Sequence, residues 1–65
     1  MIAINSKSLM QPYFITLQWP ERDESTVIET SAPSIEGPMK LAQKFSEPGV
    51  IVSLTNSAGV VEWKA

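Results

Sequence analysis

The sequence contains no cysteine and no histidine among its 65 residues. Without cysteine, the chain can form neither a disulfide framework nor a thiolate metal site. Without histidine, it lacks the commonest general base and the commonest metal ligand. A serine or cysteine nucleophile activated by histidine is therefore excluded. We expect a protein that is not an enzyme and that uses no cofactor.

Charge is also scarce, and neither sign is concentrated. Five basic and seven acidic residues give a net charge of −2. A nucleic-acid-binding domain of this size usually carries a clustered basic face, whereas the basic residues here are scattered along the chain. We therefore expect a protein partner and no direct contact with nucleic acid. A weak negative charge favours a basic surface on that partner.

Long apolar runs are absent as well. The longest apolar stretch is far shorter than the roughly 20 residues that a membrane span requires. The first residues lack the basic start and apolar core of a signal peptide. These features predict a cytoplasmic protein without membrane attachment. A chain of 65 residues also predicts a single domain over residues 1–65, because a second domain would fall below the size that folds alone.

What the sequence does contain is a set of short segments with strand periodicity. Residues 13–19 are aromatic and β-branched, alternate between two faces, and lie between two prolines, as expected for a half-buried strand. Residues 26–30, 50–55 and 60–64 are three further strand candidates. Residues 1–11 fit either a short edge strand or a loose arm.

Two other segments complete the plan. Residues 20–25 are the most charged part of the chain and predict a solvated hairpin loop. After residues 31–34 the apolar spacing changes to that of a helix. We predict a helix over residues 38–46 after a loose turn at 34–37, because a proline deeper in a helix removes a hydrogen bond. The apolar stripe of this helix consists of Ile35, Met39, Ala42 and Phe45.

These elements predict an α+β fold, namely a four- or five-stranded antiparallel sheet with one helix packed on one face (β-β-α-β-β). One helix covers only one face of such a sheet, so the other face meets water. The predicted core face carries Tyr13, Ile15, Leu17, Ile28, Val50, Val52, Leu54, Val61 and Trp63. The predicted open face keeps Phe14, Val27, Ile51 and Val60.

The open face is the predicted partner-binding surface. An apolar centre with a charged rim is the usual anatomy of a protein contact, and the charged loop extends that rim. The alternative interpretation is that these apolar side chains merely cover one another. The predicted partner-binding residues are Phe14, Glu21, Asp23, Glu24, Glu29, Ile51, Val60, Glu62 and Lys64.

A resemblance to a known family covers residues 26–64. The segments that carry it are Thr26-Val27-Ile28-Glu29-Thr30, Ala32-Pro33-Ser34, Ala42-Gln43-Lys44 and Val50-Ile51-Val52-Ser53, followed by a glycine turn. Their arrangement resembles that of some type I-F anti-CRISPR proteins, which are small phage-encoded chains with one helix on an antiparallel sheet. No functional residue can be carried over, because the resemblance contains no diagnostic motif.

The resemblance implies a stoichiometric inhibitor that docks on a host nucleoprotein complex, the CRISPR surveillance complex, and blocks target DNA. The host cytoplasm would be the place of action. The alternative is a structural or assembly protein that associates with itself and closes its open face or an edge of the sheet by dimerisation. The oligomeric states that we expect are accordingly a monomer or a homodimer.

Overall fold

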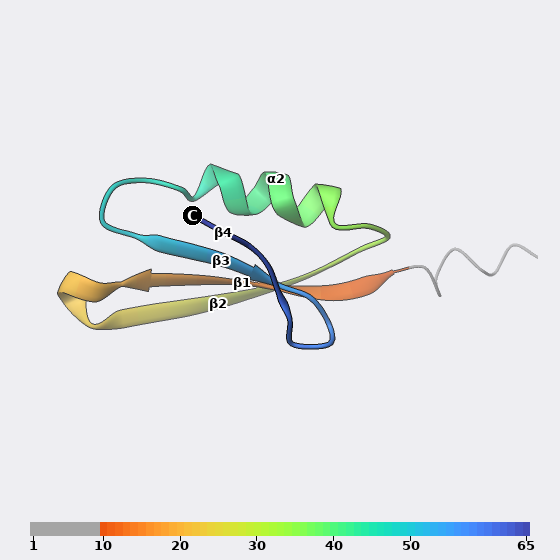
Figure 1. The fold of residues 1–65 in the computed structure, drawn as a ribbon, viewed down its shortest axis with the longest axis horizontal. Helices are drawn as coiled ribbons and strands as arrows, with labels where there is room; N and C mark the ends of the chain where they lie inside the picture. Colours follow the sequence, from red (N-terminus) through yellow and green to blue (C-terminus); the bar gives the residue numbers. More distant parts are fainter. Residues whose placement is uncertain (1–9) are drawn as a thin grey trace, which may run out of the picture.

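The computed structural model describes residues 10–65, in which two strands are followed by a helix and two further strands (Figure 1). The elements are β1 (Gln11–Trp19), the 3-10 turn η1 (Pro20–Arg22), β2 (Glu24–Ala32), α2 (Glu36–Lys44), β3 (Ile51–Thr55) and β4 (Val61–Lys64). The predicted arm or fifth strand at residues 1–11 falls mostly outside the described residues. Of that segment, Gln11 belongs to β1.

The four strands form one antiparallel sheet in the order β2-β1-β3-β4. The predicted α+β fold with one helix on the sheet is confirmed, with four strands among residues 10–65. β2 and β3 flank β1 on opposite sides, and α2 connects them across it. Figure 1 shows the helix above the sheet and the β1–β2 hairpin tip extending beyond the helix end.

The core lies between α2 and one face of the sheet. Because side chains alternate along a strand, the register places the buried residues of β1 and β3 on this face, which we call the helix face. Ile28, which is opposite Ile15 on β2, packs against them. The buried core residues are Tyr13, Ile15, Leu17, Ala42, Val52 and Leu54.

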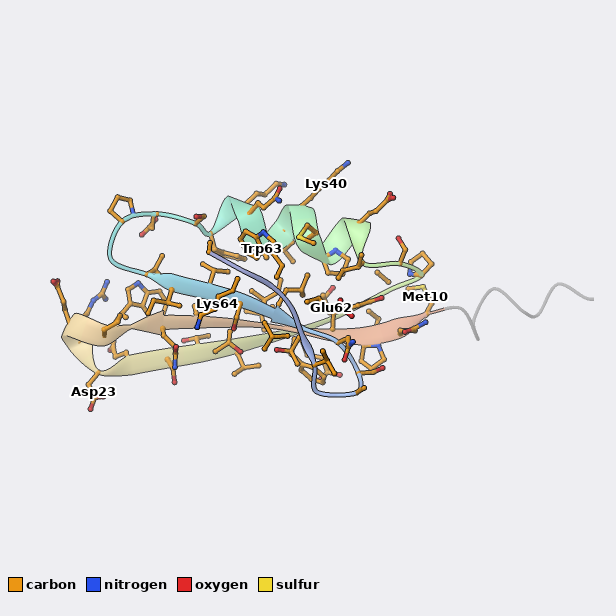
Figure 2. All side chains as sticks on the ribbon, in the orientation of Figure 1. Met10, Asp23, Lys40, Glu62, Trp63 and Lys64 are labelled. Atoms are coloured by element: carbon orange, nitrogen blue, oxygen red, sulfur yellow. The ribbon has the colours of Figure 1, made fainter. Side chains whose placement is uncertain are left out.

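The helix begins at Glu36, two residues before the predicted start. The first four N–H groups of a helix have no partner within it, so Pro38, at the third helical position, removes no helical hydrogen bond. The amide of Met39 makes the first bond, to the carbonyl of Ile35 at 2.8 Å. The predicted apolar stripe faces the sheet, and Lys40 points away from it (Figure 2).

β1 and β2 are longer than the alternation predicted. β2 extends from Glu24 to Ala32, so the predicted loop at 20–25 narrows to the four residues Pro20 to Asp23. Asp23 adopts a left-handed conformation with φ 54°, which Asp tolerates better than most residues. Of the additional β2 residues, Glu24, Ser25 and Ser31 are polar, and Ala32 alone packs against the core. They join the strand because β1 lies beside them in register.

β4 contains an irregularity that moves Val61 out of the predicted core. Trp63 pairs with Leu54, but Val61 instead of Glu62 pairs with Thr55, because the register shifts between Leu54 and Thr55. Such a bulge sets two residues of one strand against one of its partner. Val61 therefore shares the side of Thr55 and is 55% exposed. The prediction that it belongs to the core is wrong.

Candidate functional site

The sheet face away from α2, the open face, carries three rows of side chains that each extend across three or four strands. Each row follows from the pairing of neighbouring strands, because directly opposite residues project to the same side. From β2 across to β4 the rows are Glu29–Phe14–Thr55–Val61, Val27–Thr16–Ser53–Lys64 and Ser25–Gln18–Ile51. Phe14 and Ile51, two of the predicted partner-binding residues, therefore lie on this face.

The middle of the open face is polar. Thr16 and Ser53 form the centre of the second row. Phe14 is opposite Thr55, whereas Ile51 lies four residues earlier on the same strand, which is about 13 Å at the rise of an extended chain. Phe14 and Ile51 are thus separated by hydroxyl side chains. The face offers hydrogen-bonding groups at its centre and apolar side chains around them.

Val60 and Glu62 lie beside this face, in and next to the β3–β4 turn. Val60 precedes β4 and is 55% exposed. The carboxylate of Glu62 accepts a hydrogen bond of 2.6 Å from Nδ2 of Asn56. The Oδ1 atom of Asn56 accepts two more, from the amides of Ala58 at 2.9 Å and Val60 at 3.0 Å. Glu62 is therefore tied to the turn.

Asn56 is the residue of this surface that the sequence reasoning did not single out. The sequence did carry a signal for this role, because an asparagine side chain in a turn often accepts a hydrogen bond from the backbone amide two residues later. The turn closes with Gly59, which adopts φ +83°. This geometry fixes the direction of β4 and with it the positions of Val61 and Lys64 on the open face.

The charged hairpin tip lies at one end of the sheet, and Asp23 points outward there, at the opposite end from Met10 (Figure 2). Arg22 lies 5.4 Å from the centre of the Trp19 ring and contacts Glu24 at 3.5 Å. Both side chains of the Arg22–Glu24 pair are exposed, so the pair adds little stability. Glu21, Asp23 and Glu24 are therefore not gathered on the open face.

A shallow hollow of about 220 Å³ lies at this tip, lined by Gln18, Trp19, Pro20, Asp23, Glu24 and Ser25. Small-molecule sites usually enclose roughly 300–1,000 Å³ and have mostly apolar walls. This hollow is smaller and opens to solvent between charged residues. Within residues 10–65, no group of three or more acidic side chains is close enough to hold a metal ion.

The backbone of β3 shows which way each strand's hydrogen-bonding groups point. The amide of Ala65 donates to the carbonyl of Val52 at 2.9 Å, so the backbone groups of Val52 point toward β4. In an antiparallel sheet, successive residues point to opposite neighbours. The β3 residues that point toward β1 are therefore Ile51, Ser53 and Thr55.

The same alternation fixes the outer edge of β2. The partners of those β3 residues are Gln18, Thr16 and Phe14, so the residues between them on β1 bond to β2. The backbone groups of β2 that point away from the sheet belong to Ser25, Val27, Glu29 and Ser31, and no strand within residues 10–65 lies on that side to bond with them. The backbone of Pro12 points toward the β3 side but lies beyond the end of that strand. Its missing N–H therefore removes no hydrogen bond between β1 and β3.

No protein-family model matches the chain, and no curated protein or solved structure matches it. Among residues 10–65, no helix has both the length and the apolar character to cross a membrane. The functional interpretation therefore depends on the surfaces described above.

Proposed function

We propose that the chain is a non-catalytic, stoichiometric protein-binding module whose contact surface is the open face. The proposal rests on the observation that the helix covers only one face of the sheet. Within residues 10–65, α2 packs on the helix face, and the other face keeps Val27 60% and Val61 55% exposed. Phe14 and Ile51 are half-buried on that same face.

The composition of the face supports binding to a protein. Interfaces between separately stable proteins combine apolar contacts with about one hydrogen bond per 100–200 Å². The apolar side chains of the open face lie among polar ones around the hydroxyl groups of Thr16 and Ser53. A partner can thus bury the apolar atoms and also satisfy the central polar groups.

The charges around the face favour a partner with a basic surface. Glu29 lies in the first row and Lys64 in the second, and Glu62 is beside the turn. Beyond the third row, the hairpin tip carries Glu21, Asp23 and Glu24 against the single basic Arg22. Rim charges of this kind mainly raise the association rate and are screened by salt.

A finer form of the proposal names the partner as a host defence complex in the cytoplasm of a phage host. Its support is the resemblance of residues 26–64 to type I-F anti-CRISPR proteins, together with the one-helix sheet. This form has its own test, in which purified surveillance complex is mixed with equimolar protein. Loss of target-DNA binding is expected, and unchanged DNA binding would contradict the finer form alone.

The general proposal is tested by changing the centre of the open face. Thr16→Arg places a long charged side chain in the middle row, where the backbone tolerates it. Gln43→Arg makes the same charge change on the exposed side of α2. Both variants should keep the parent's circular dichroism. In affinity capture from lysate with quantitative mass spectrometry, Thr16→Arg should lose the proteins that the parent and Gln43→Arg retain. Equal capture by all three would contradict the proposal.

The alternative function, a self-associating structural or assembly protein, is favoured by one separate observation. This is the long outer edge of β2, whose backbone groups no strand within residues 10–65 satisfies. It concerns backbone groups at the border of the open face, to which Val27 and Glu29 also belong, and leads to the inference below.

A further inference from the structure

The two edges of the sheet differ sharply in how well they are protected against further strand pairing. β4 has four residues and a bulge, and its outward-pointing residues are the charged Glu62 and Lys64. Short, bulged and charged edges are the usual protection of natural sheets. β2 has nine residues, pairs in uninterrupted register with β1, and contains no proline and no lysine; its charged residues are Glu24 and Glu29. In Figure 1 it runs beside β1 at the lower border of the sheet.

From this edge we propose that two copies of the chain pair antiparallel through β2, so that their sheets join into one continuous sheet with a two-fold axis at Ile28. This inference deepens the self-association alternative and stands or falls independently of the open-face proposal. Ile28 is the midpoint of Glu24–Ala32, so this register pairs the whole strand.

The backbone directions agree with this register. A hydrogen-bonded antiparallel pair needs two residues whose backbone groups both point outward. With the axis at Ile28, Ser25 is opposite Ser31 of the second copy and Val27 is opposite Glu29 of the second copy. Every outward group of β2 then has a partner, which gives about eight backbone hydrogen bonds across the joint at two per pair.

The side chains on the helix face also fit. Ile28 would meet Ile28 of the second copy in a non-hydrogen-bonded pair, the closer of the two pair types. Within each chain Ile28 is opposite Ile15, which is opposite Leu54, so the two cores would join in one apolar row. Thr26 would be opposite Thr30 of the second copy, a pairing that stabilises sheets.

The positions of the charged residues and the length of strand that is paired favour an axis at Ile28 over an axis at either neighbouring residue. An axis at Glu29 would set two carboxylates directly opposite each other, which is destabilising. An axis at Val27 keeps the charges apart but leaves Ser31 and Ala32 unpaired. Only the axis at Ile28 pairs all of β2 and puts each Glu29 opposite an uncharged residue.

The register is tested by opposite charge changes at Val27, whose side chain is 60% exposed. The backbone groups of Val27 point out of the sheet and would be hydrogen-bonded only in the dimer. Val27→Lys would face Glu29 of the second copy at two symmetric places and should tighten the dimer. Val27→Glu would face the same carboxylate and should weaken it. Gln43→Lys and Gln43→Glu make the same charge changes on exposed α2 and serve as controls.

The measurement is sedimentation equilibrium of the full 65-residue chain at low salt, from micromolar to millimolar concentration. The parent should shift from monomer to dimer within that range. The dissociation constant should fall about tenfold for Val27→Lys and rise about tenfold for Val27→Glu, as expected from about 1.4 kcal/mol in each direction. The Gln43 controls should match the parent.

Two results would overturn the inference. A parent chain that stays monomeric throughout the range rules out pairing with a second copy, whatever then covers the β2 edge. A dimer that both Val27 variants weaken indicates an axis at Val27, where like charges would meet, and rejects the register at Ile28. Neither result bears on capture by the Thr16→Arg variant, so the two proposals fail separately.

Discussion

The side chain of Asn56 makes three hydrogen bonds in the β3–β4 turn, two from backbone amides and one to Glu62. The two amide bonds stabilise the bend, and the third holds a rim carboxylate beside it. The residues whose placement depends on this single side chain therefore include Val61, which the alternation of the sequence assigns to the wrong face.

Asn56→Ala should lower the free energy of unfolding by about 1–2 kcal/mol, because the turn loses hydrogen bonds worth roughly 0.5–1.5 kcal/mol each. Ser57→Ala, at the next and exposed position, is the control and should change stability by less than about 0.5 kcal/mol. Urea unfolding followed by tryptophan fluorescence measures both. Equal losses in the two variants would mean that the Asn56 side chain does not hold the turn.

Leu54 and Val61 lie on the same hairpin, yet Leu54 is fully buried and Val61 is 55% exposed. Leu54→Ala should cost about 2–5 kcal/mol, as for other large-to-small changes in a core, and in a domain with about 5 kcal/mol of stability it should largely unfold the chain. Val61→Ala should cost less than about 0.5 kcal/mol, as is usual for surface changes.

Circular dichroism and thermal unfolding distinguish these two variants. A large loss of stability for Val61→Ala would mean that Val61 lies in the core, which would contradict the bulge in β4. It would also take Val61 off the open face and weaken the proposed contact surface.

At the scale of the elements, the helix shows which signals the sequence carried well. The change of apolar period located α2 and the residues that face the sheet. Its start was predicted two residues late, because the rule against proline in a helix applies only beyond the first turn, and Pro38 lies within it.

The strands show the opposite case. β1 was predictable because its alternation is buried on one side, whereas the ends of β2 carry no apolar alternation and become strand because β1 pairs with them. The bulge in β4 has no apolar signature. A one-residue shift reverses the faces of a strand, so alternation alone misassigned Val61.

Two glycines in different elements lead to different predictions. Gly37 lies in the first turn of α2 with open space where a Cβ would lie, whereas Gly59 has φ +83° in the β3–β4 turn. Gly37→Ala should change stability by less than about 0.5 kcal/mol, because the helix preference of alanine is offset by the clash of its Cβ with the ring of Pro38 in the helical conformation. Gly59→Ala should lower it by about 1–2 kcal/mol, because a Cβ disfavours the left-handed conformation.

Both effects appear as shifts of the urea midpoint at constant slope. A stabilised Gly59→Ala would show that the turn adopts another conformation. A Gly37→Ala variant stabilised by about 1 kcal/mol or more would show that the ring of Pro38 does not restrict residue 37.

For the molecule as a whole, the sequence predicted the fold class and the existence of an uncovered sheet face. It also placed Phe14 and Ile51 on that face. It could not predict that hydroxyl groups separate them or that β2 is an edge, because strand order and register arise from pairings between distant segments. The proposed binding surface is therefore a mixed polar and apolar face, in place of the compact apolar centre that alternation suggested.

The neighbouring aromatic residues Tyr13 and Phe14 provide the most direct test of that surface. They lie on opposite faces of β1, with Tyr13 only 6% exposed in the core and Phe14 half-buried on the open face. Hydroxyl-radical footprinting with tandem mass spectrometry can follow both rings in the free chain and in the captured complex. Phe14 should be oxidised in the free chain and protected in the complex, while Tyr13 stays unreactive in both. A complex in which Phe14 is oxidised as fast as in the free chain would contradict binding through the open face.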